Sequence, residues 1–199
     1  MDIKLRQKSL FEQLGAEVAH LSQTIDYSEL EQLLNLLVNN SHNIFVTGCG
    51  TSAMAAKKIV HTLQVINHKA FYLNPSDAVH GALGAVSADD IVIIISKGGN
   101  TKELISFLPN LVKKDTHIVA VTENKNSQIA KTAQMAITIK TNSELDKFGM
   151  LATTSTLAVI AVFDVIAVTL MQMEDFSENQ FLLNHPSGAV GQQLREELK

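Results

Sequence analysis

The sequence predicts an α/β fold, a three-layer α/β/α doubly wound (Rossmann-like) domain with a mainly parallel five-stranded sheet. Strand-like and helix-like segments alternate from residue 43 to residue 141, which is typical of βαβ units. The strand-like segments are apolar at consecutive positions, as parallel strands covered on both faces are. No linker rich in Pro, Gly or Ser interrupts the 199 residues, so we expect a single domain.

Two helices are expected before the sheet. Apolar residues recur at helical spacing in residues 3–24 and again in residues 26–40, where Asn39 and Asn40 suit a helix end. We expect residues 1–40 to form a helical hairpin packed on the domain.

The sheet elements then follow in order. The five expected strands, rich in β-branched or aromatic residues, are residues 43–48, 69–74, 90–96, 117–123 and 135–141. The expected intervening helices are residues 51–66, 101–114 and 127–133, with residues 75–84 as a short helix or loop.

The segment from Met150 to Met173 is apolar and long enough to span a bilayer. However, Asp164 lies at its middle, where a charge in a membrane costs roughly 2.5–3.5 kcal/mol. We therefore expect no membrane partner, and predict a helix covered on most of its circumference. A helix that is apolar on nearly all sides needs such cover, so this segment also suggests a subunit interface.

Composition narrows the functional classes. A net charge of −4 and a pI near 5.9 do not favour a nucleic-acid partner. The single cysteine, Cys49, permits no internal disulfide and fits a reducing cytoplasm. The histidines lack ligand spacing, so we expect no metal site, and no cofactor.

Two expected strands end in loops of similar design. In each loop, glycines permit a tight turn and a hydroxyl residue opens the next helix. The residues are Gly48, Gly50, Thr51 and Ser52 in the first loop and Ser96, Gly98, Gly99 and Thr101 in the second. The hydroxyls taken singly fit ordinary helix caps. Two such loops on neighbouring parallel strands would face one pocket, and a helix N-terminus with hydroxyl donors binds a phosphate monoester.

A nucleotide is a weaker candidate for this pocket. The stretch GCGTSA matches only part of the dinucleotide fingerprint, and the strand at residues 69–74 ends without the acidic residue that binds a ribose. No Walker motif is present, so a small phosphorylated ligand fits better.

Several segments resemble a known family. GCGTS is similar to a loop in the isomerase half of glucosamine-6-phosphate synthase, which contains the sugar isomerase (SIS) domain. PSDAVHGALGAVSADDIVIIIS, SELDKFGMLATTST and NHPSGAVGQQL resemble arabinose-5-phosphate isomerases of the KpsF/GutQ type. The similarity extends over roughly residues 35–196. Those enzymes usually carry C-terminal CBS modules, so we expect this chain to be the catalytic domain alone.

The resemblance implies a metal-independent aldose–ketose isomerase, usually tetrameric, in which one histidine reaches into a neighbouring subunit's site. It implies that the phosphate is bound by Ser52, Ser96 and Thr101, helped by Gly50, Thr51, Lys97 and Gly98. It implies acid–base or sugar-binding roles for His80, Glu103, Glu144 and His185.

The sequence departs from the isomerase pattern at two positions. The isomerases have a lysine where this chain has Thr51, and a Ser-Asn-Ser-Gly-Glu loop where this chain has residues 96–100, which include Lys97. We hypothesise that Lys97 supplies the missing positive charge from the facing loop. Because the lysine is at position 97 rather than at position 51, the identity of the sugar stays open.

Aldose–ketose isomerisation moves a proton between C1 and C2 through an enediol, and needs a base and an acid. Glu103, in the first turn of the helix that Thr101 opens, is our first choice for the base, although the position also suits a solvated capping residue. His185 is preferred for ring opening, and His80, taken alone, also fits a structural role. Glu144 is expected to bind sugar hydroxyls or to assist His80.

Two alternatives remain open. A phosphosugar-binding module without catalysis is favoured by the absence of lysine at position 51. A dinucleotide-dependent redox enzyme is the weakest hypothesis.

Overall fold

The structure, a computed structural model, describes residues 2–197 and contains one five-stranded parallel sheet. The strands are β1 (Ile44–Gly48), β2 (Ala70–Tyr72), β3 (Ile91–Ile95), β4 (His117–Thr122) and β5 (Met135–Thr138). Their order in the sheet is β2-β1-β3-β4-β5, and every neighbouring pair is parallel. The α/β fold predicted from the sequence is thereby confirmed.

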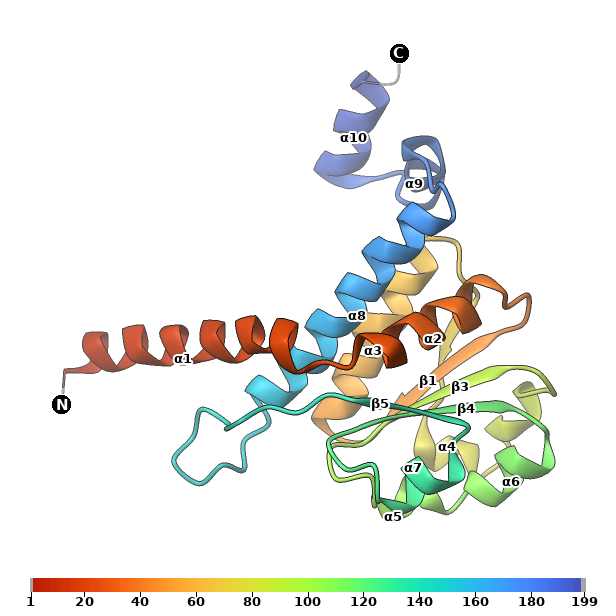
Figure 1. The fold of residues 1–199 in the computed structure, drawn as a ribbon. Coiled ribbons are helices and arrows are strands. Elements are labelled where there is room, and N and C mark those ends of the chain that lie inside the picture. The colour runs from red at the N-terminus through yellow and green to blue at the C-terminus, as the bar shows by residue number, and fades with distance from the viewer. Residues whose placement is uncertain (1, 198–199) are drawn as a thin grey trace.

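Helices cover both faces of the sheet (Figure 1). One layer consists of α2 (Tyr27–Val38), α3 (Thr51–Val65) and α8 (Thr154–Met173). The other consists of α4 (Pro75–Ala78), α5 (Lys102–Ile105), α6 (Leu108–Lys113) and α7 (Gln128–Thr132), with a 3-10 turn, η1 (Ala82–Ala85), between α4 and β3. The remaining helices are α1 (Ile3–Thr24), α9 (Glu178–Asn184) and α10 (Gly188–Glu197).

The central strands explain why the sheet needs both layers. In β3, Ile91, Ile93 and Ile95 pack with the layer of α2, α3 and α8, whereas Val92 and Ile94 pack with the opposite layer. All five side chains are buried, because successive residues of a strand point to opposite faces. Each such side chain contributes about 1.5–3 kcal/mol when it is buried completely.

Helix bounds differ from the expected ones in two places. Residues 101–114 form two helices, α5 and α6, rather than one, and Pro109 lies in the first turn of α6. A proline has no N–H to donate within a continuous helix and clashes with the preceding turn, but it is accepted at a helix start. The long apolar helix begins at Thr154 rather than at Met150, because Asp146 accepts backbone hydrogen bonds from Phe148, Met150 and Leu151 and holds that stretch in a turn.

The first two helices do not fold back on each other (Figure 1). Helix α2 lies over the sheet, whereas α1 leaves the body as an arm, and Ile3, Leu5 and Phe11 on this arm are exposed. The expected hairpin is therefore replaced by an extended arrangement. Toward its C-terminal end α1 packs against α8, and Leu21 joins the core there.

Helix α8 is, within residues 2–197, the one helix whose length and composition would allow it to cross a membrane. In the structure it packs against α1, α2 and α3, and residues such as Ala158, Val162, Ile166 and Leu170 join the core on that face of the sheet. Val165 and Val168 lie on its other side and are 60% and 56% exposed. Helix α8 is therefore a core helix on one side and an apolar surface on the other.

Candidate functional site

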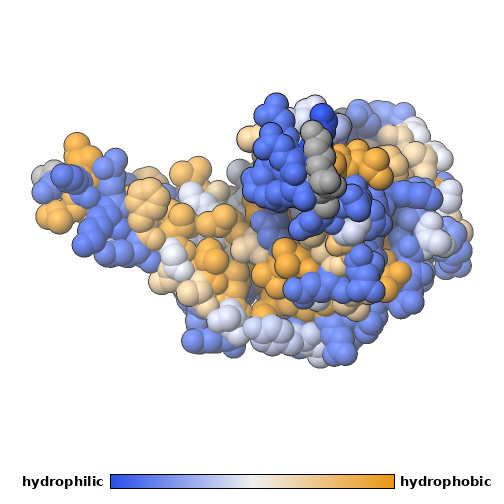
Figure 2. Space-filling view, turned by 90° about the horizontal axis from the view of Figure 1, so that it is seen from above, coloured by the Kyte–Doolittle hydropathy of each residue, from blue (hydrophilic) through white to orange (hydrophobic). Residues whose placement is uncertain are grey.

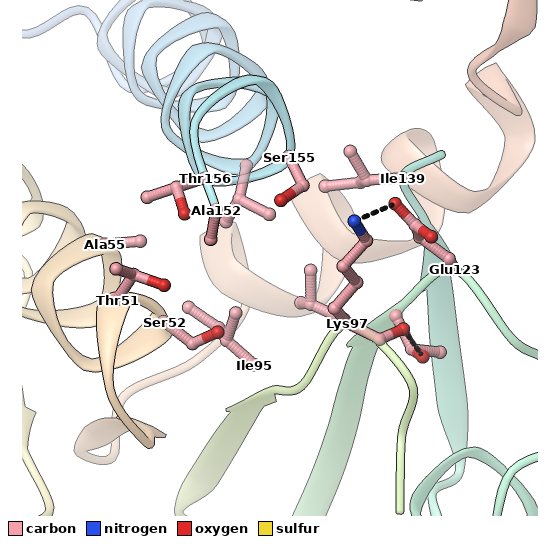
Figure 3. A pocket seen from close by; sticks show the side chains of 13 residues that line it. Thr51, Ser52, Ala55, Ile95, Lys97, Glu123, Ile139, Ala152, Ser155 and Thr156 are labelled. Atoms are coloured by element: carbon pink, nitrogen blue, oxygen red, sulfur yellow. Dashed lines mark hydrogen bonds and ion pairs between the residues drawn. The ribbon is translucent and has the colours of Figure 1, made fainter. Parts of the chain in front are cut away.

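A pocket lies at the carboxyl ends of β1, β3 and β4. The register aligns Gly48 with Ile95, and Ile95 with Val121, so the loops after these three strands begin at one level. Strand β1 lies between β2 and β3, so the strand order reverses there, and ligands of open α/β sheets bind at this switch point. The pocket measures about 510 Å³, including space open to solvent, and Thr51, Ser52, Lys97, Glu123, Ser155 and Thr156 are among its lining residues (Figure 3).

The left wall of the pocket in Figure 3 is the start of α3. Thr51 and Ser52 form its first turn, and its N-cap, Gly50, has no side chain to cap the first amides. Gly50 has a φ of 59°, a conformation that glycine adopts without strain. A Cβ at Gly48 would lie 2.9 Å from the backbone of Ser52, so the close approach of β1 to α3 requires glycine. The helix therefore presents uncapped N–H groups, with their partial positive charge, beside two hydroxyls.

Lys97 lies on the opposite wall and is held in place by a buried carboxylate. Its Nζ donates a hydrogen bond of 2.7 Å to Oε1 of Glu144. Glu144, only 5% exposed, also accepts hydrogen bonds from the backbone N–H groups of Thr153 and Ser155 and from the hydroxyls of Thr153, Thr154 and Ser155. Burial acts to raise the pKa of Glu144, but the hydrogen bonds from Lys97, Ser155 and Thr153 outweigh it and hold the pKa well below its ordinary value. Glu144 thus joins the start of α8 to the lysine of the pocket.

Hydroxyl groups hold the loop after β3 in its shape. The Ser96 hydroxyl, 2.9 Å from that of Thr101, accepts the backbone N–H of Gly99 at 3.1 Å. A Cβ at Gly99 would lie 2.0 Å from the Ser127 hydroxyl oxygen, so this turn also requires glycine. Ser96 is buried, and in this structure its hydroxyl supports the loop that places Lys97 in the pocket.

The structure brings together three of the residues that the sequence suggested for the phosphate. Thr51, Ser52 and Lys97 line the pocket. Gly50 stands at the entrance to α3, and Ser96, Gly98 and Thr101 form the loop on either side of Lys97 and do not line the pocket.

The residues suggested for acid–base chemistry lie apart from one another. Glu103 is exposed in the first turn of α5, near Cys49, and together with burial its charge raises the pKa of the Cys49 thiol. His80 is exposed between α4 and η1. Glu144 is buried behind Lys97.

His185 lies far from the pocket of its own chain. It caps the C-terminal end of α9, and its ring stacks on Phe181 at 5.7 Å between centroids. The pocket is at the N-terminal end of α8, whereas α9 follows the opposite end of that helix (Figure 1). A helix of 20 residues is roughly 30 Å long at 1.5 Å per residue. Within one chain His185 cannot reach a ligand in the pocket.

Sequence reasoning missed four polar residues of the pocket, namely Thr122, Glu123, Ser155 and Thr156. Glu123 directly follows β4, as Ser96 directly follows β3, so its position at a strand end was the signal. Ser155 and Thr156 belong to the run of hydroxyl residues at positions 153–156, which comes close to the sheet only because α8 folds back over it. Between residues 2 and 197, the His, Cys, Asp and Glu side chains form no cluster suited to a metal ion.

The fold and the pocket define a class of protein. A 2-1-3-4-5 parallel sheet with a hydroxyl-lined helix start at its switch point is a doubly wound α/β domain, and the SIS domain model matches residues 37–169. The chain belongs to the SIS domain family.

Similar proteins include solved structures and curated relatives. The crystal structure of a candidate sugar-phosphate isomerase from Listeria monocytogenes is 39% identical, with a TM-score of 0.91 over 94% of this chain and 100% of that one. The structure of an Escherichia coli CFT073 protein in complex with arabinose 5-phosphate is 29% identical, with a TM-score of 0.89 over 93% of this chain and 98% of that one. The arabinose 5-phosphate isomerase KpsF of Escherichia coli is 31% identical over 180 residues, 90% of this chain. This chain spans 57% of the length of KpsF.

Proposed function

We propose that the protein is an aldose–ketose isomerase that acts on a phosphorylated sugar, similar to arabinose 5-phosphate isomerase. The observation that carries the proposal is the pocket at the switch point, in which an uncapped helix start with two hydroxyls faces a lysine. The similarity to KpsF and to a protein solved with arabinose 5-phosphate supports this choice of ligand class.

The phosphate is proposed to bind against the first turn of α3. Ser52 and Thr51 supply hydroxyl donors there, the helix amides supply N–H donors, and Lys97 supplies a positive charge from the other wall. Ser96, Thr101 and the glycines Gly50 and Gly98 are proposed to keep the two loops in the binding shape, or to join the contact once the ligand is bound.

The chemistry is proposed to be proton transfer through an enediol, without a metal or cofactor. Glu103 removes the proton from C1 or C2, and a histidine, preferably His185, opens the sugar ring. His80 and Glu144 complete the proposed set. Glu144 acts on the sugar through Lys97, since its carboxylate is bound by this lysine and by the start of α8.

Proton exchange tests the proposal directly. When sugar monophosphates, arabinose 5-phosphate among them, are incubated with the protein in D₂O, deuterium is expected at C1 or C2 in the NMR spectrum of at least one of them. The reason is that an enediol exchanges its carbon-bound proton with the solvent. Binding to members of the panel with no exchange in any of them would reject the isomerase.

Such a result would favour the second candidate, a phosphosugar-binding module without catalysis. The pairing of Lys97 supports this second candidate. Its Nζ lies 2.7 Å from Oε1 of Glu144 and 3.9 Å from Oε1 of Glu123. The pocket thus holds less uncompensated positive charge than a lysine alone would give.

We further propose that the protein is a cytoplasmic homo-oligomer, a dimer or a tetramer, with sites shared between subunits. Apolar side chains lie along the α1 arm and at its junction with the body (Figure 2). An apolar groove lined by Val18, Leu21, Ile25, Ala161 and Val165 lies at the surface where α1 and α8 meet. Association would cover these surfaces and would allow His185 to serve the pocket of a neighbouring subunit.

Light scattering checks the oligomer. The wild-type chain is expected to show two or four times the chain mass of 21.7 kDa. Phe11→Asp is expected to shift the mass toward that of a single chain, because it places a charge on the exposed apolar arm, where Phe11 is 75% exposed. Val112→Asp, an exposed position on α6 in the opposite layer, is the matched control. A wild-type protein of one chain mass would contradict the proposal.

A further inference from the structure

Glu123 is the second carboxyl group near Lys97, and the backbone fixes its position. Its backbone N–H donates a hydrogen bond of 2.9 Å to the carbonyl of Lys97, and the Thr122 hydroxyl donates to the same carbonyl at 2.9 Å. The ends of β3 and β4 are therefore tied together beyond the sheet itself. As a result Glu123 and Lys97 lie side by side on one wall, across the pocket from Ser52 (Figure 3).

The two carboxyl groups near Lys97 differ in what they bind. Glu144 is closed off behind the wall, with its oxygens bound by Lys97 and the start of α8. Glu123 lines the pocket, and its carboxyl lies 3.5 Å from the Thr141 hydroxyl and 3.9 Å from Lys97, with Thr141 also binding it through the backbone. Its carboxyl therefore retains hydrogen-bonding capacity for a molecule in the pocket.

The surroundings of Glu123 raise the pKa of its carboxyl above the ordinary value. Burial raises the pKa of its carboxyl, the charge of Lys97 and the hydrogen bonds from Thr141 oppose this, and the charge of Glu144 adds to the rise. The groups that act on it are thus Lys97 from the loop after β3, and Glu144 and Thr141 from the segment after β5. A dianionic phosphate monoester would bring further negative charge into the same pocket and raise this pKa again.

We propose that Glu123 is an acid–base residue of the pocket, which takes up a proton when a sugar phosphate binds and donates it in a hydrogen bond to a sugar oxygen. The class of ligand rests on the proposed function. In the isomerisation, as the base removes the carbon-bound proton and the electron pair forms the C1=C2 bond, the carbonyl oxygen takes the proton of Glu123. The Glu123 carboxylate then accepts the proton from the enediol hydroxyl on the other carbon, whose oxygen becomes the new carbonyl oxygen. At the same time the base returns its proton to the carbon that carried the original carbonyl.

Calorimetry at pH 8, where the phosphate monoester is a dianion, tests the proton uptake. Arabinose 5-phosphate, or whichever sugar monophosphate of the D₂O panel binds, is titrated into the protein in two buffers that differ in ionisation enthalpy. The wild-type protein is expected to take up a measurable fraction of one proton per bound molecule. Glu123→Gln is expected to bind with little or no uptake, whereas Glu123→Asp retains part of it. Glu31→Gln, an exposed position on α2, is expected to behave as the wild type.

Steady-state kinetics gives an independent readout. Glu123→Gln is expected to lower kcat by about 10²-fold, with a small change in KM, and to alter the pH profile of kcat, because a general acid contributes roughly 10²–10⁴-fold. Thermal unfolding of each variant shows whether it is folded. Equal proton uptake by folded Glu123→Gln and the wild type would overturn the inference and leave the proposed function intact. A wild-type protein that binds no member of the panel would overturn both.

Discussion

Glu103→Gln is expected to lower kcat for isomerisation by about 10²–10⁴-fold, the range that a positioned general base contributes. Glu103 is exposed in the first turn of α5, beside the loop that carries Cys49. The amide of glutamine has nearly the same shape as the carboxylate but cannot accept the carbon-bound proton. Because Glu103 does not line the phosphate pocket, the dissociation constant of the sugar phosphate is expected to change by less than about threefold.

Deuterium exchange at C1 or C2 and calorimetric binding measure these two effects separately. Glu31→Gln on α2 changes the same chemical group at an exposed position outside the pocket and serves as the control. If Glu103→Gln kept the wild-type rate of exchange, another group would be the base. Glu123 would be the first to consider, since its carboxyl lines the pocket.

Lys97→Ala is expected to weaken binding of the sugar phosphate by about 10–100-fold, the effect of losing one charge-assisted hydrogen bond. Two consequences of the change act in the same direction. The ammonium group is lost from the wall facing Ser52, and the negative charge of Glu144, now without its lysine, repels the phosphate from behind that wall. The loss is expected to shrink at high salt, since the interaction is electrostatic and Lys97 is partly exposed.

Calorimetry of Lys97→Ala and of Lys131→Ala compares the pocket lysine with an exposed lysine on α7. The double variant with Thr51→Lys added tests whether a cation on the α3 side can substitute for one on the β3 side, and affinity is expected to recover in part. Full affinity in Lys97→Ala alone would dispose of the idea that Lys97 supplies the missing charge.

The fold could be predicted from local sequence patterns such as apolar runs and helical periodicity. The expected helix bounds were wrong where two such patterns compete. Runs such as Ile91–Ile95 are apolar at every position, and this property by itself indicates parallel strands covered on both faces. Residues 101–114 carried one helical pattern, yet Pro109 divides it into α5 and α6. Apolar residues recur along one side of helix α1 at helical spacing, but this spacing does not determine which element packs against that side.

The candidate site was predictable in part, for a geometric reason. Thr51, Ser52 and Lys97 follow closely after strands, so parallel register alone brought them to one pocket. Ser155 and Thr156 reach it from a helix more than fifty residues farther along the chain than Lys97. Their contribution depends on how α8 packs against α1, α2 and α3, which no local pattern encodes.

The amino-acid sequence by itself determined the layers, the parallel sheet and the two glycine–hydroxyl loops at its switch point, since these depend on periodicity and on residues adjacent in the chain. Only the tertiary structure decided that Glu144 is bound behind Lys97, that Glu123 lines the pocket, and that His185 lies at the far end of α8. Those facts depend on distances between segments that are remote in sequence. Such distances are set by how the helices pack on the sheet, because side-chain volume and buried polar groups must be matched there.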